Sequence, residues 1–131
     1  MTDNKRHDPF PVATPFRGIY SHGVEAPPGL RTLHVSGQIG IAPDGSLAPD
    51  FRGQCLQSLR NVEAVLADAG MGFSDIVKMA FYLVRREDLA ALVEVRKSLL
   101  DGVRPAVTTL FVAGLVAPEW LIEIEATACA P

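Results

Sequence analysis

The sequence has no long hydrophobic run, no surplus of basic residues, and few cysteines or histidines. Its longest apolar stretch, residues 110–118, is interrupted by Gly114 and is far shorter than the roughly 20 residues that cross a bilayer. The first twenty residues carry charges and no continuous apolar segment, so we expect neither a signal peptide nor a membrane anchor. These absences predict a soluble protein of the cytoplasm.

The charge balance and the placement of cysteines and histidines argue against a nucleic-acid-binding protein and against a metalloprotein. Twelve basic residues against fifteen acidic ones give a formal net charge of -3, and no basic run exceeds two residues. Such a chain cannot neutralise successive phosphates, which argues against nucleic acid as a partner. The two cysteines are far apart, and the three histidines form no ligand spacing with carboxylates, so we expect no metal site. Without a phosphate-binding glycine loop or a dinucleotide fingerprint, we also expect no cofactor.

The remaining pattern is that of one small domain behind an N-terminal arm. Residues 1–15 are polar and then broken by prolines, which predicts a mobile or loosely docked arm before a domain spanning 16–131. Alternating and periodic apolar residues predict the elements of that domain. Strands are expected at 20–26, 31–39, 76–84, 107–112 and 121–126, and helices at 51–69 and between 88 and 102.

This order predicts an α+β fold, with one sheet, its first two strands joined as a hairpin, and two helices on one face. The other face would then carry Ala80, Tyr82, Thr109 and Phe111. Because that face is too apolar for water, we expect subunits to pack sheet against sheet, with sites in the clefts between them.

Two carboxylates stand out on the last strand. Glu123 and Glu125 share one face by the period-two geometry of a strand, whose other face is Ile122, Ile124 and Ala126. One interpretation is structural, with each carboxylate paired to a basic group or a backbone donor at a subunit junction. The other is functional, with one carboxylate orienting a water or a polar ligand in the cleft.

Five short motifs in order give the chain a family resemblance. They are GIYSHG at 18–23, VSGQI at 35–39, DIVK at 75–78, RPA at 104–106 and IEIEA at 122–126. Together they resemble the RidA/YjgF family over about residues 16–129. The resemblance implies a chorismate-mutase-like α+β fold, a homotrimer with clefts between subunits, and hydrolysis of reactive enamines and imines to keto acids and ammonia without metal or cofactor.

Four residues match the family's site. The resemblance implies that Tyr20 is the cleft tyrosine, that Ser36 and Gly37 line the pocket, and that Glu123 handles the attacking water. Tyr20 and Glu123 are therefore the expected catalytic residues.

Three other expected ligand-binding positions differ from the family pattern. Val107 stands where the pattern has an arginine that clamps the substrate carboxylate, Val93 replaces an asparagine, and Thr109 replaces a cysteine. A guanidinium–carboxylate pair is strong and bidentate, and neither Arg104 nor Arg31 would aim its side chain from the same place. These changes predict a divergent imine or enamine deaminase with a less acidic substrate. The alternatives are a non-catalytic metabolite-binding or sensing protein and, less favoured, an endoribonuclease or translation inhibitor.

Overall fold

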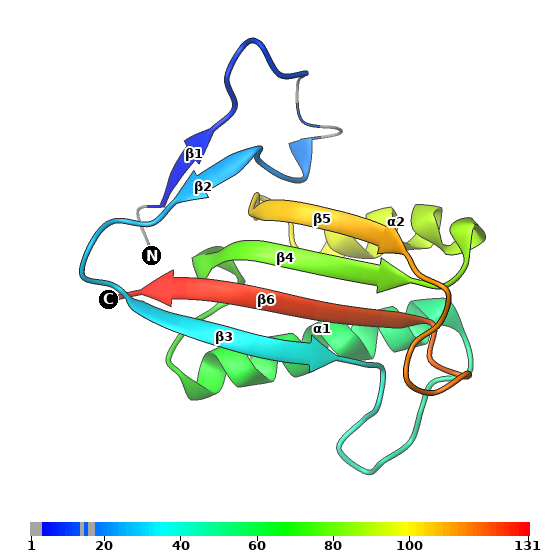
Figure 1. Ribbon diagram of the computed structural model, residues 1–131. Coiled ribbons are helices and arrows are strands. Elements are labelled where there is room, and N and C mark those ends of the chain that lie inside the picture. Colours follow the sequence, from blue (N-terminus) through cyan, green and yellow to red (C-terminus); the bar gives the residue numbers. More distant parts are fainter. Residues whose placement is uncertain (1–3, 14, 16–17) are drawn as a thin grey trace.

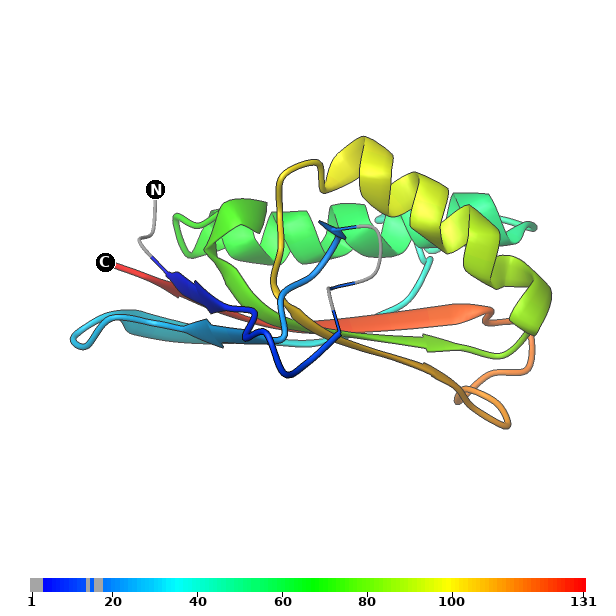
Figure 2. The same cartoon turned by 90° about the horizontal axis from the view of Figure 1, so that it is seen from above.

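A four-stranded mixed sheet covered by two helices forms the body of the protein (Figure 1). The computed structural model describes residues 4–13, 15 and 18–131. The strands are β3 (Arg31–Gln38), β4 (Ile76–Leu83), β5 (Ala106–Phe111) and β6 (Ile122–Ala130), in the order β3-β6-β4-β5. β6 is antiparallel to both neighbours, and β5 runs parallel to β4. The helices α1 (Phe51–Asp68) and α2 (Leu89–Leu99) lie on the same face, which confirms the α+β prediction (Figure 2).

Local signals explain where the helices begin and end. The Asp50 carboxylate accepts a hydrogen bond from the Gly53 amide (3.1 Å) and so caps α1. After α1, Gly70 adopts a left-handed conformation (φ +71°), which favours glycine and ends the helix. Two short 3₁₀ turns, η2 (Phe73–Asp75) and η3 (Arg86–Asp88), lead into β4 and α2.

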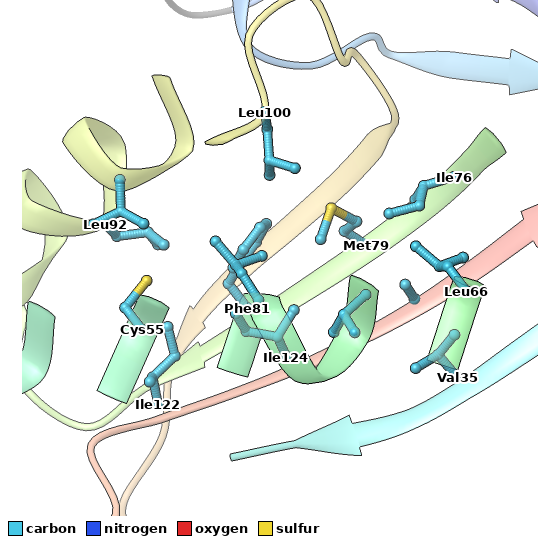
Figure 3. Packing of buried hydrophobic residues seen from close by; sticks show 14 of the residues in the cluster. Val35, Cys55, Leu66, Ile76, Met79, Phe81, Leu92, Leu100, Ile122 and Ile124 are labelled. Carbon is cyan, nitrogen blue, oxygen red and sulfur yellow. The ribbon is translucent and has the colours of Figure 1, made fainter. Parts of the chain in front are cut away.

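The core lies between the helices and the covered face of the sheet (Figure 3). The core side chains of α1 recur every three to four residues, and those of β4 and β6 recur every second residue. Phe81, Leu83, Ile122 and Ile124 are fully buried there. Burying each such side chain stabilises the fold by about 1.5–3 kcal/mol.

The N-terminal part of the chain differs from the expected hairpin. β2 (Gly23–Glu25) pairs with β1 (Lys5–His7) and not with β3, so the two form a separate two-stranded sheet. β2 lies on the β5 side of the main sheet, while β3 is the opposite edge (Figure 1). The hairpin prediction was wrong because the true partner of β2 is β1, a short charged segment without the alternation that predicts a strand. Part of the expected arm is thus docked by backbone pairing.

The phase of β5 also differs from the prediction. Thr109 pairs with Phe81, and Phe111 pairs with Leu83, so both lie on the helix-covered face. Ala80 and Tyr82 lie on the open face as predicted. The apolar residues of β5 fit either phase, because Leu110, Phe111 and Val112 are consecutive.

Candidate functional site

The open face of the sheet presents Glu123 and Glu125, as the alternation of β6 predicts. Glu123 is half-buried and lies opposite Tyr82 in the β4–β6 register. Glu125 is exposed, and its carboxylate accepts a hydrogen bond from the Tyr82 hydroxyl. That hydrogen bond raises the pKa of Tyr82, because loss of the phenolic proton would break it. The Tyr82 hydroxyl thus holds the Glu125 carboxylate, whereas it makes no hydrogen bond to Glu123.

A glycine allows Glu123 to lie close to the neighbouring strand. A Cβ on Gly37 of β3 would be 2.2 Å from Glu123 Oε2 and 2.8 Å from its Cδ, so the carboxylate rests against the backbone of Gly37. The structure therefore brings Gly37 to Glu123. Ser36, the preceding residue, is exposed, and its carbonyl accepts a hydrogen bond from Nε2 of the Gln38 side chain (3.1 Å).

A hollow of about 280 Å³ opens beside these carboxylates. The residues around it come from β4, β6 and the loop after β5, and they are Tyr82, Val112, Gly114, Leu115, Glu123 and Glu125. Carboxylates and a phenol next to aliphatic side chains suit a small ligand with one polar and one apolar part. Tyr82 and the loop after β5 were not among the residues predicted to form the site.

Tyr20 lies near the start of β5, whereas the hollow borders the loop that follows the end of this strand. The next residue, Ser21, forms a parallel bridge with Ala106, and its amide donates to the Pro105 carbonyl (3.0 Å). The Tyr20 ring is half-buried and meets the ring of His22 edge to face, with 5.6 Å between their centroids. Tyr20 is thus beside the start of the strand that carries Val107 and Thr109.

Val107, Thr109 and Val93 belong to the helix-covered side of the sheet. Val107 pairs with Met79 and packs against the core, and Thr109 pairs with Phe81. Val93 is buried on α2. The predicted residues therefore form two groups. Gly37 and Glu123 meet on the open face, whereas Val107 and Thr109 face the helices, so one chain does not bring all of them together.

Sequence reasoning missed a buried arginine on α2. Arg96 has 5% of its surface exposed, and its guanidinium carbon lies 4.8 Å from the centroid of the Phe81 ring. Its Nη2 donates to the Ile19 carbonyl (2.6 Å), and its buried Nε has no hydrogen-bond partner in the part of the chain that is described. Burial lowers the pKa of Arg96 to about 10, so the group is still cationic at pH 7. The signal was a charged residue on the apolar side of the predicted helix.

The other arginines considered from the sequence are placed for structural contacts. Arg104 donates from Nε and Nη2 to the Tyr20 carbonyl (both 3.2 Å), and Arg31 donates to the carbonyls of Pro131 (3.0 Å) and Ala69 (3.1 Å). Neither occupies the place of an arginine at position 107.

Within residues 4–13, 15 and 18–131, no three or more histidine, cysteine or acidic side chains are grouped to hold a metal ion. In the same residues, no helix is long and apolar enough to span a bilayer. Cys55 and Cys129 are both buried and are not joined in a disulfide.

The fold and this site define a small α+β protein with a YjgF-type arrangement of sheet and helices, and comparisons with known proteins agree. The family model described as Endoribonuclease L-PSP matches residues 12–130. A mouse protein named 2-iminobutanoate/2-iminopropanoate deaminase is 34% identical over 113 residues, which cover 85% of this chain and 81% of that protein.

Two solved structures extend the comparison. The Rid-family protein YyfB of Yersinia pestis, described as a protein of unknown function, has a TM-score of 0.88 at 34% identity and covers 98% of this chain and 99% of its own. Escherichia coli TdcF with bound serine has a TM-score of 0.73 at 32% identity, with 86% and 88% covered. The chain belongs to the Endoribonuclease L-PSP family, which is the RidA/YjgF family of the sequence motifs.

Proposed function

We propose that this protein is a deaminase that hydrolyses the C=N bond of a small imine or of its enamine tautomer. In this reaction water adds to the imine carbon, the C–N bond breaks, and a carbonyl compound and ammonia are released. The observation that carries the proposal is the placement of Glu123, which is half-buried, rests against Gly37 and borders a hollow. The name of the mouse relative supports the same chemistry.

Glu123 has the chemistry that such a hydrolysis needs. As a general base, its carboxylate accepts a proton from the attacking water, and as the conjugate acid it then returns that proton to the departing nitrogen. Neither step uses a metal or an organic cofactor, so we assign none. Tyr20 positions the ligand through its hydroxyl.

The complete site is proposed to form between copies of the chain. Glu123 and Gly37 lie on the open face, while Tyr20, Thr109 and Val93 belong to the β5 edge and the helix side. A ligand that touches both groups therefore needs a second copy to supply one of them. Leu110, which is 47% exposed and pairs with Tyr82 of the open face, adds apolar surface there for such a contact. We propose a homotrimer, as the resemblance implies, in the cytoplasm and without nucleic acid as a partner.

The ligand is proposed to be less acidic than a 2-imino acid. Val107 offers an isopropyl group where the resemblance implies a guanidinium, and Arg96 already donates to the Ile19 carbonyl. Val93 adds a second aliphatic side chain where an amide is implied. An imine with a neutral or apolar substituent suits these side chains best.

The test measures ammonia release from a panel of neutral and acidic imines generated in solution. We expect turnover that Glu123→Gln lowers by about 10²–10⁴-fold, the usual worth of general acid–base catalysis. Glu119→Gln, an exposed carboxylate in the loop before β6, is the matched control and should keep its activity. Equal activity of wild type and Glu123→Gln would refute the assignment.

The same panel separates two other functions. Val107 and Val93 also suit a protein that binds a metabolite without converting it. Ligands that raise the melting temperature without releasing ammonia would favour that role. Incubation with RNA tests the endoribonuclease named in the family model, and the net charge of -3 leads us to expect no cleavage.

A further inference from the structure

Residues 19–21, the segment that carries Tyr20, have little regular structure, yet each of them is held by a hydrogen bond from a residue distant in sequence. The Ile19 carbonyl accepts from Arg96 of α2 (2.6 Å), and the Tyr20 carbonyl accepts from Arg104 (3.2 Å). The Ser21 amide donates to the Pro105 carbonyl (3.0 Å). Because residues 19–21 are not within a strand or a helix, these bonds fix the backbone that positions the Tyr20 ring.

One residue of the N-terminal arm connects two of these contacts. Asp8 Oδ1 accepts from the His22 amide (2.7 Å), and Asp8 Oδ2 pairs with Arg104 Nη2 (3.1 Å). The same Nη2 also donates to the Tyr20 carbonyl. The Asp8 side chain is 23% exposed and that of Arg104 is 33% exposed, so this pair is better shielded than an open surface ion pair.

The contact continues to the ring of Tyr20. Asp8 holds the backbone of His22, whose ring meets the Tyr20 ring edge to face. The arm itself is anchored before Asp8 by the backbone pairing of β1 with β2. The contact of His7 with the Glu25 carboxylate (2.9 Å) is an exposed surface pair and adds little to this anchor. Asp8 therefore contacts Tyr20 indirectly in two ways. Through Arg104 it reaches the Tyr20 carbonyl, and through His22 it reaches the Tyr20 ring.

We propose that Asp8 is a positioning residue for Tyr20, which makes the N-terminal arm part of the active site. This inference rests on the proposed function, because it assigns Tyr20 a place in the reaction. The match to the family model begins at residue 12, so Asp8 lies before the matched region. In this protein the arm thus supplies the contacts of Asp8 with His22 and Arg104 from outside the matched region.

Kinetics of single and double variants test the proposal. Asp8→Ala should lower kcat/KM for imine hydrolysis by about tenfold, since a displacement of about 1 Å in a positioned group is costly. If Asp8 acts through Tyr20, Tyr20→Phe/Asp8→Ala should be no slower than Tyr20→Phe alone, within about twofold. Glu25→Gln, which replaces an exposed carboxylate of the β1–β2 sheet, should keep wild-type activity. A full additional loss in the double variant would overturn the proposal.

Amide hydrogen exchange gives a readout that does not need activity. Asp8→Ala removes the acceptor of the His22 amide, so exchange at residues 21–22 should accelerate about tenfold, while Glu25→Gln should leave it unchanged. Unchanged exchange in Asp8→Ala refutes the positioning role even if hydrolysis occurs. Faster exchange in a protein without deaminase activity refutes the proposed function instead. If Asp8→Ala does not fold, Asp8→Asn replaces it, because asparagine keeps an acceptor oxygen but not the charge. In that variant the increase in the exchange rate should be smaller and of the same sign.

Discussion

The contact between Gly37 and Glu123 makes a single methyl group a sharp probe of the site. In Gly37→Ala, the new Cβ would lie 2.2 Å from Glu123 Oε2, whereas ordinary contact begins near 3.4 Å. The carboxylate must therefore move by roughly 1.2 Å. A displacement of about 1 Å in a catalytic group can cost 10²-fold, so we expect kcat/KM for imine hydrolysis to fall by about that factor.

Stability should change far less than activity in this variant. The clashing atoms belong to the end of a flexible side chain on a face without a closed core, so the carboxylate can turn away at a cost of about 1 kcal/mol in rotamer energy. Ammonia release and urea unfolding, measured on the same preparations, separate the two effects. Gly72→Ala is the matched control, because a Cβ there would have no heavy atom within 4 Å. Wild-type activity in a folded Gly37→Ala would refute the role of Glu123 geometry.

Two further predictions concern buried groups. Arg96→Met should leave the free energy of unfolding within about 1 kcal/mol of wild type in urea titrations at pH 7. The variant loses the hydrogen bond to the Ile19 carbonyl, but it also no longer has to bury a cation. A loss of stability above about 3 kcal/mol would contradict this expectation. Burial raises the pKa of the Cys55 thiol to about 12, so in a Cys129→Ser variant at pH 8 it should react with a thiol reagent about 10³-fold more slowly in the folded than in the unfolded protein. The same shift stabilises the fold below about pH 9, and that contribution is lost as the pH rises toward 12; equally fast labelling of the folded form would refute the buried placement.

The sequence was sufficient for the elements whose side-chain period is strong. The α1 helix and its Asp50 cap, and the two carboxylates on one face of β6, follow from spacing alone. β5 was predicted as a strand but in the wrong phase, because consecutive apolar residues satisfy either face. The β2 pairing failed for a different reason, since its partner β1 is a short charged segment, KRH, without any alternation.

The parts of the site that escaped prediction are those held by contacts distant in sequence. Asp8 is 96 residues from Arg104 and 14 from His22, and a lone aspartate in a polar arm gives no periodic signal. Arg96 had a signal, a charge among apolar neighbours, but spacing could not show that its guanidinium points inward to Phe81 and Ile19. Motif order predicted Glu123 and Gly37 as site residues, and the structure shows that the two are in direct contact.

The two faces of the sheet carry different residues of the proposed site. A β-sheet is one backbone layer thick, and Glu123 and Thr109 project from opposite sides of it, so no small ligand can contact both within one chain. β5 is an edge strand of the sheet, and Tyr20 lies beside it. Among the residues on the helix-covered side, those of β5 are therefore the ones that a second copy can approach most closely. We therefore expect that Glu123→Gln and Tyr20→Phe, each with lowered activity by itself, will regain activity when mixed subunits form sites with one intact copy of each residue. Failure of mixed assemblies to recover any turnover would argue that both residues act from the same chain.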